Sequence, residues 1–228
     1  MPIDRILTLL ILAVLGYLIV LACHHRPDAY RAWLGRSLAL SLAGYAATIY
    51  LQMAAAGELS VSYTLPLELC HCVMFACVVS LLRPNRLTSE IAYFCGLAGT
   101  LPAMMTPDIG CGFPSWEYIQ FYWAHGSVLL AVVFLIASGG FRPRAGSMWR
   151  VFAAVNMYAA VVGVIDAAFG WNYGYLCEKP AHPSLMDYLG PWPWYILSLE
   201  AFAIVAFWLL DLPWRLARRP SAARFSPR

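Results

Sequence analysis

The stretch ILTLLILAVLGYLIVLA, residues 6–22, contains no charged side chain, and a helix needs roughly 20 apolar residues of this kind to cross a bilayer. Six further apolar stretches follow along the chain, near residues 34–53, 63–82, 88–106, 117–139, 150–170 and 191–212. Because little chain remains between them, the sequence predicts an all-α, polytopic membrane protein with seven transmembrane helices. We expect residues 1–213 to form a single seven-helix transmembrane domain and residues 214–228 to form a basic cytoplasmic tail.

The charged residues agree with this class of protein and predict its orientation. Only 12% of the residues are charged, against about 25% in a typical soluble domain. Arginines gather in alternate connections and in the tail, whereas Arg5 and Lys179 are the basic residues on the opposite side. Because cytoplasmic loops are rich in Lys and Arg, we expect the N-terminus outside, the C-terminus inside and a multi-pass location in the cell membrane. Arginines beside a membrane helix ordinarily contact lipid headgroups, so no nucleic-acid partner is predicted.

Four chemically active residues lie inside four different apolar stretches, namely Cys70, His125, Asp166 and Glu200. Each is about six to nine residues from the predicted outer end, which corresponds to a depth of roughly 9–13 Å at about 1.5 Å per helical residue. Ionisable groups are costly in hydrocarbon, so a layer of them indicates a functional bundle interior. A thiol and an imidazole in that layer indicate covalent chemistry, with His125 as the base for a cysteine nucleophile.

The motif Cys70-His71-Cys72 leaves the choice of nucleophile open when only the residues are considered. Consecutive helical residues point about 100° apart, so these three side chains do not converge on one metal ion, and neither a metal nor another cofactor is predicted. Glu68, His71 and Cys72 share one helix face, whereas Cys70 points to another. Cys70 and Cys72 are therefore rival nucleophiles.

The outer connections hold further polar, aromatic and cysteine residues. Cys111 and Cys177 form a disulfide or remain two free thiols, and the sequence favours neither. The aromatic residues there are either an interfacial belt or part of a structured lid. The residues expected to bind substrate or orient the active groups are Glu68, His71, Thr106, Asp108, Tyr122, Asp166, Asn172, Tyr173, Lys179, Asp187, Trp192, Trp194, Tyr195 and Glu200.

Four sets of motifs resemble those of a known family, in the same order along the chain. They are Leu65-Pro66-Leu67-Glu68-Leu69-Cys70, the segment Gly96-Leu97-Ala98-Gly99 with Met105-Thr106-Pro107-Asp108, Phe113-Pro114-Ser115 with His125-Gly126, and the run from Gly170 to Tyr195. Over about residues 35–213 the sequence resembles the YwaF-like family of seven-span membrane proteins, whose eukaryotic relatives are described as transmembrane acyltransferases.

That resemblance implies acyl transfer or lipid hydrolysis, with membrane lipids as the substrate. It also implies that Cys70, after the Pro-Leu-x-Leu motif, is the nucleophile rather than Cys72, and that His125 is its partner. Two positions depart from the family pattern. Position 68 is usually histidine and is Glu68 here, and position 166 is often asparagine and is Asp166 here.

The expected reaction runs through an acyl-thioester on the cysteine, which a lipid hydroxyl or water then resolves. Asp166 or Glu200 could orient His125, or the two could instead form a structural pair between the last two spans. Asn172 and Tyr173 could donate hydrogen bonds to the oxyanion. The competing hypothesis is a seven-helix receptor or small-molecule transporter without covalent chemistry. The sequence does not indicate an oligomeric state.

Overall fold

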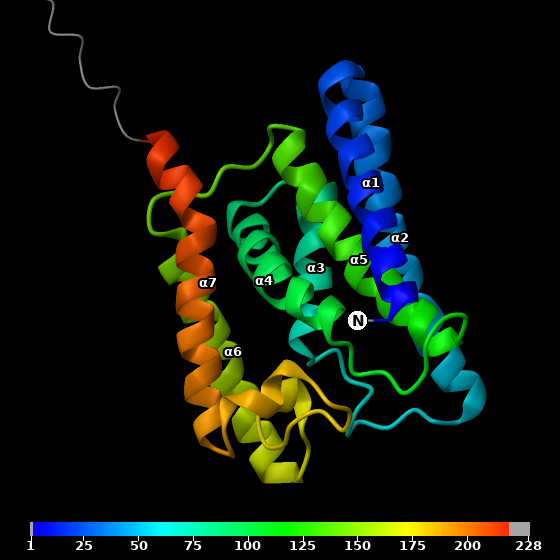
Figure 1. The fold of residues 1–228 in the computed structure, drawn as a ribbon, viewed down its shortest axis with the longest axis vertical. Coiled ribbons are helices and arrows are strands. Elements are labelled where there is room, and N and C mark those ends of the chain that lie inside the picture. The colour runs from blue at the N-terminus through cyan, green and yellow to red at the C-terminus, as the bar shows by residue number, and fades with distance from the viewer. Residues whose placement is uncertain (1, 219–228) are drawn as a thin grey trace, which may run out of the picture.

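The computed structural model describes residues 2–218, and within that range its regular structure is entirely helical (Figure 1). The predicted tail starts inside the last helix, and its residues 219–228 lie outside the described part of the chain. The helices are α1 (Ile3–His25), α2 (Asp28–Ala56), α3 (Leu69–Leu82), α4 (Arg86–Met105), α5 (Trp116–Ala137), α6 (Ser147–Phe169) and α7 (Trp194–Arg218). Two short 3₁₀ helices, η1 (Tyr173–Tyr175) and η2 (Leu185–Leu189), lie between α6 and α7.

Five of these helices, α1, α2, α5, α6 and α7, are long and apolar enough to cross a membrane. The helix α3 is apolar but has 14 residues, which is about 21 Å at 1.5 Å per residue and less than the hydrocarbon thickness of about 30 Å. The predicted span 63–82 is therefore wrong at its start, because residues 57–68 form turns instead of helix. Seven crossings and their orientation stay predictions.

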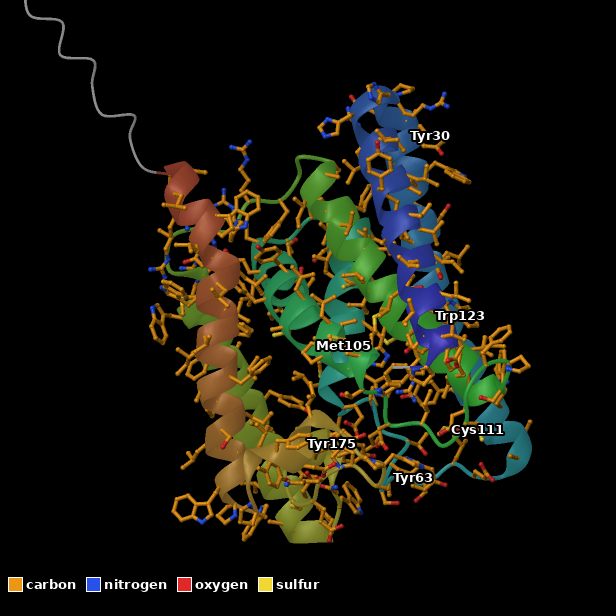
Figure 2. The ribbon with its side chains drawn as sticks, viewed as in Figure 1. Tyr30, Tyr63, Met105, Cys111, Trp123 and Tyr175 are labelled. Carbon is orange, nitrogen blue, oxygen red and sulfur yellow. The ribbon has the colours of Figure 1, made fainter. Side chains whose placement is uncertain are left out.

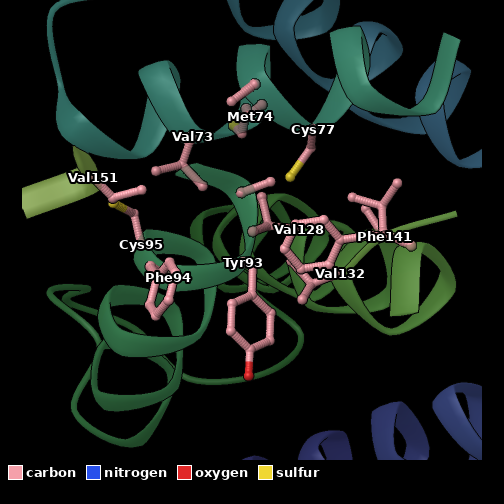
Figure 3. Packing of buried hydrophobic residues seen from close by; sticks show 14 of the residues in the cluster. Val73, Met74, Cys77, Tyr93, Phe94, Cys95, Val128, Val132, Phe141 and Val151 are labelled. Atoms are coloured by element: carbon pink, nitrogen blue, oxygen red, sulfur yellow. The ribbon is translucent and has the colours of Figure 1, made fainter. Parts of the chain in front are cut away.

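The helices α3, α4 and α5 lie between the α1–α2 pair and the α6–α7 pair (Figure 1). Their shared core contains fully buried Cys77, Phe94 and Val132 (Figure 3). Gly96 allows α4 and α5 to approach closely, because a Cβ there would lie 3.1 Å from Cγ2 of Val132. The core thus fixes α3 against both neighbouring helices.

Two buried carboxylates bind arginines at the end of the molecule that contains the α1–α2 and α5–α6 connections and the C-terminus of α7, hereafter the arginine-rich end (Figure 1). Glu90, 1% exposed, accepts hydrogen bonds from Nε and Nη2 of Arg144, both at 2.8 Å, and from Oγ of Ser147 at 2.6 Å. Asp211, also 1% exposed, accepts from Arg215 and Arg218. These ion pairs tie the α5–α6 connection to α4 and order the end of α7.

Replacing Glu90 by Gln is expected to lower the free energy of unfolding by about 1–3 kcal/mol, because Arg144 and Ser147 lose a buried charged acceptor. Thermal unfolding in detergent, followed by circular dichroism, measures the effect. The exposed Glu58→Gln variant is the control and should unfold at the wild-type temperature. Equal unfolding temperatures for the two variants would contradict this assignment.

Candidate active site

A cavity of about 60 Å³ lies between α3, α4 and α5, and Cys70 and His125 both line it. Its wall is otherwise mostly apolar, with Thr100 as the other polar side chain. The full lining is Leu69, Cys70, Val73, Met74, Cys95, Gly99, Thr100, Ala124, His125 and Val128. The tertiary structure thus brings together the two residues that sequence reasoning selected as nucleophile and base.

Cys70 is the second residue of α3, and its side chain is exposed toward the cavity. The first turn of a helix carries unpaired N–H groups and the positive end of the helix dipole, which favours an anionic sulfur there. Cys72, the rival nucleophile, is absent from the cavity lining, and its thiol instead faces the carbonyl oxygen of Pro66 at 3.9 Å. The geometry therefore favours Cys70 over Cys72.

His125 is held by its own helix. Its Nδ1 lies 2.9 Å from the carbonyl oxygen of Phe121, and the two aromatic rings stack with centroids 4.1 Å apart and planes inclined by 22°. Because a carbonyl oxygen only accepts hydrogen bonds, Nδ1 must carry the proton, and Nε2 retains the lone pair that a general base needs. A backbone carbonyl at Nδ1, rather than Asp166 or Glu200, thus orients the imidazole.

The two carboxylates of the predicted layer lie outside the cavity lining. Glu200 accepts a hydrogen bond from Nδ2 of Asn156 at 3.0 Å, which joins α7 to α6. Asp166 is 1% exposed, and neither carboxylate oxygen has a hydrogen-bond partner among residues 2–218. The alternative pairing of Asp166 with Glu200 is therefore wrong, although equal depth on neighbouring helices made it reasonable.

Hydrogen bonds from the α6–α7 region hold the turns that precede α3. The hydroxyl of Tyr173, a residue 1% exposed, donates to the carbonyl oxygen of Val61 at 2.7 Å and accepts from the backbone N–H of Leu65 at 3.0 Å. Oε2 of Glu68 accepts from the backbone N–H of Gly174 at 3.0 Å. The hydroxyl of Tyr173 therefore stabilises the turns before α3. It does not fill the oxyanion role that the sequence predicted for it.

The glycine of η1 is required by its surroundings. Gly174 has a φ of +66°, and a Cβ there would lie 2.8 Å from the hydroxyl oxygen of Tyr158. That hydroxyl donates to the carbonyl oxygen of Leu67 at 2.5 Å, so it cannot move away without losing this bond. Glycine therefore permits the close approach of η1 to α6 and to the start of α3.

The connection between α6 and α7 is an ordered cap beside the start of α3. Asp108 receives hydrogen bonds from the Tyr175 hydroxyl at 3.0 Å and from Nδ1 of His182 at 2.7 Å. Burial and the adjacent Asp108 carboxylate raise the pKa of Tyr175, so its phenol stays protonated and remains a donor. Tyr63, Cys111 and Tyr175, from three different connections, lie at the same end of the molecule, which we call the Cys70 end (Figure 2).

The other residues predicted to bind or orient substrate lie outside the cavity lining, and several hold the cap in place. Nδ2 of Asn172 donates to the carbonyl oxygen of Glu178 at 3.1 Å, and its Oδ1 accepts from the backbone N–H groups of Cys177 and Glu178, so both ends of this amide serve the cap. Five of the remaining ones make local contacts: Thr106 bonds Pro102, Tyr122 bonds Met104, Asp187 caps η2, Lys179 lies over the Tyr195 ring, and Trp192 bonds Leu176. Nδ1 of His71 is buried without a hydrogen-bond partner among residues 2–218, and Trp194 is exposed. Cys111 and Cys177 are free thiols in the structure.

Sequence reasoning missed the α4 side of the cavity, where Cys95, Gly99 and Thr100 contribute to the wall. Tyr45 of α2 was also missed, and it packs against the core cluster that includes Val73, Cys95 and Val128 of the cavity wall. The spacing of Cys95 and Gly99 by one helical turn, with Thr100 beside Gly99, was the available signal. Small and weakly polar residues are common on membrane helices, so this signal alone does not distinguish a cavity from helix packing.

A sequence profile of the TMEM164 family matches residues 2–211. The chain belongs to the TMEM164 family. This is a family of transmembrane proteins, and together with the five long apolar helices it makes the chain a multi-pass membrane protein. The match includes residues 2–34, which carried none of the motifs used in the sequence analysis. No curated protein and no solved structure matches the chain.

Replacing Tyr173 by Phe is expected to lower the free energy of unfolding by about 1–3 kcal/mol, because the carbonyl of Val61 and the N–H of Leu65 lose a shared partner. Chemical unfolding in detergent measures this change. Tyr188→Phe, at a residue 87% exposed, is the matched control and should be neutral. A neutral Tyr173→Phe variant would show that the turns before α3 do not need this hydroxyl.

Proposed function

We propose that this protein is a membrane-embedded lipid acyltransferase or lipid hydrolase with Cys70 as nucleophile and His125 as general base. The observation that carries the proposal is the shared cavity: Cys70 from α3 and His125 from α5 line the same space between three packed helices. The Nε2 lone pair of His125, left free by the bond from Nδ1 to Phe121, supports the assignment of the base.

The first half-reaction transfers an acyl group to sulfur. Nε2 of His125 takes the proton of the Cys70 thiol, and the sulfur attacks the carbonyl carbon of a lipid ester. The tetrahedral intermediate collapses as the bond between carbon and the leaving oxygen breaks. The imidazolium then returns its proton to that oxygen, which leaves as the hydroxyl of a deacylated lipid, and the acyl group stays on Cys70 as a thioester.

The second half-reaction releases the acyl group. Nε2 of His125 takes a proton from an incoming hydroxyl, whose oxygen attacks the thioester carbonyl, and the carbon–sulfur bond breaks. The proton passes from the imidazolium to the departing sulfur, which restores the thiol. A lipid hydroxyl makes the protein an acyltransferase, and water makes it a hydrolase. The cavity of about 60 Å³ has room for the ester group and not for a whole acyl chain, and its mostly apolar wall suits the first carbons of that chain in both cases.

Two side chains beside the cavity are suited to stabilise the negative charge that develops on the carbonyl oxygen. Thr100 contributes a hydroxyl to the wall, and Tyr45 packs against the core cluster that includes Val73 and Val128 of that wall. Both groups can donate hydrogen bonds, and in a water-poor site such donors stabilise an oxyanion more strongly than water does. We assign them this role in place of Asn172 and Tyr173, whose polar groups are used within the cap and the turns before α3.

The proposed acyl-enzyme can be detected directly. Wild-type protein incubated with phospholipid should carry a hydroxylamine-labile acyl group on Cys70, found by peptide mass spectrometry. Cys70→Ser should abolish this adduct, and His125→Ala should slow its formation by about 10²–10⁴-fold, the usual contribution of a general base. Cys72→Ser is the matched control and should acylate normally. A reproducible lack of adduct in the wild type, with the lipids unchanged, would instead support a receptor or transporter without covalent chemistry.

A larger side chain at Gly99 would fill the cavity without altering its chemical groups. Gly99 lines the cavity, and no atom lies within 4 Å of a Cβ built there, so Gly99→Leu should keep the fold and fill the space that the acyl group needs. Acylation of Cys70 should fall at least about tenfold, which corresponds to roughly 1.4 kcal/mol in the barrier. Gly44→Leu on α2, where space is equally open, is the control. Full acylation of Gly99→Leu would exclude this cavity as the acyl site.

A further inference from the structure

Arg5 is a cation without a partner on the packed face of α1. The side chain is half-buried, and its Nε is buried without a hydrogen-bond partner among residues 2–218. The ion pairs formed within this range do not include it. The arginines that form ion pairs are Arg31, Arg144, Arg150, Arg215 and Arg218. A buried polar group without a partner requires an explanation, and a ligand that supplies a hydrogen-bond acceptor is one of the few available.

The position of Arg5 follows from the spacing of its neighbours. Leu9 and Leu12 lie four and seven residues further along α1, on the same helix face, and both pack against the cluster of Met104 and Tyr122. The guanidinium lies within electrostatic range of the Tyr122 phenol. Arg5 therefore lies at the N-terminal end of the buried face of α1, beside α5 and the C-terminal end of α4.

Two contacts hold this turn of α1 in place without using the arginine. The hydroxyl oxygens of Thr8 and Tyr118 are 2.7 Å apart, and Oδ2 of Asp4 accepts a hydrogen bond from the backbone N–H of Phe113 at 3.2 Å. The carboxylate nearest in sequence thus bonds a backbone N–H, and it forms no ion pair with Arg5. The N-cap residue of α1, Pro2, provides no side-chain hydrogen bond, so the N–H groups of the first turn also remain available to an anion.

The same seam between α1 and α5 continues to the cavity. Phe121 belongs to the cluster under Arg5, and its ring stacks on His125. From Tyr122 to His125 the α5 axis advances about 4.5 Å at 1.5 Å per residue. Tyr122 and His125 therefore lie on neighbouring turns of α5, a spacing comparable with the glycerol unit that joins a phosphate to its fatty-acyl esters.

We propose that the guanidinium of Arg5 binds the phosphate of a glycerophospholipid whose ester enters the Cys70 cavity. This inference rests on the proposed function, because it names the headgroup chemistry of the lipid that donates the acyl group. Arginine suits the task, since its planar donors bind two phosphate oxygens at once and it remains charged at any physiological pH. A neutral diacylglycerol would leave Arg5 unpaired and would bind less well.

The test measures binding separately from chemistry, in full-length protein carrying Cys70→Ser. Native mass spectrometry from mixed micelles would compare phosphatidylcholine with a diacylglycerol of the same acyl chains, with inorganic phosphate as competitor. We expect phosphatidylcholine to bind at least about tenfold more tightly than diacylglycerol. Adding Arg5→Gln should remove that preference and leave diacylglycerol binding unchanged, whereas Arg5→Lys should keep part of it. Arg36→Ala, at an exposed arginine, is the matched control and should keep the full preference.

Three results would overturn the inference. The first is an undiminished preference for phosphatidylcholine in Arg5→Gln. The second is an equal loss of both lipids in that variant, which would mean that Arg5 serves only packing. The third is displacement of phosphatidylcholine by inorganic phosphate at equal concentration, which would mean a site for the free anion. The proposed chemistry can be refuted separately from the lipid site. Headgroup selectivity that depends on Arg5, found together with wild-type protein that forms no adduct on Cys70, would refute the chemistry and retain the lipid site.

Discussion

The turns between α2 and α3 must satisfy their backbone polar groups without forming a helix, and the site depends on how this is achieved. Unpaired N–H and C=O groups are costly in a membrane environment. Tyr173 pairs two of them through one hydroxyl, at Val61 and Leu65, and Tyr158 pairs a third at Leu67. The helix α3 can therefore begin late. Its short length places Cys70 in a first turn, beside unpaired N–H groups and facing a cavity.

The opposite end of the molecule is held by charge. Glu90 and Asp211 are buried and bind arginines, and Trp214 of α7 donates to the hydroxyl of Tyr93 on α4 at 3.0 Å. Through these contacts α4 connects the α6–α7 pair to the rest of the bundle. The cap beside Cys70 comes from the connection between those same two helices, so the ionic contacts at one end help to position the cap at the other.

The chemistry proposed for the cavity requires few protein groups. His125 needs no carboxylate, because the carbonyl of Phe121 sets its tautomer, and the stacked ring of Phe121 limits its rotation. The proposed nucleophile and base come from different helices, so their approach depends on the packing of α3 against α5. Membership of the TMEM164 family places these groups in a transmembrane protein. The proposed acyl transfer needs a lipid ester in the cavity, and the proposed Arg5 site adds a place for the phosphate of that lipid.

The sequence by itself determined the helical membrane class, the number of helices, and Cys70 and His125 as candidates, because apolar length and the rarity of intramembrane ionisable groups are local properties. The bounds of α3 depended on tyrosines about 90 to 110 residues away, which local patterns do not reveal. Cys70 and His125 line the same cavity, but position along a helix does not give the direction in which a side chain points. Glu200 accepts a hydrogen bond from Asn156, and Asp166 has no hydrogen-bond partner among the described residues. Only the tertiary structure decided which side chains share a cavity, since that depends on how each helix is rotated about its axis by packing.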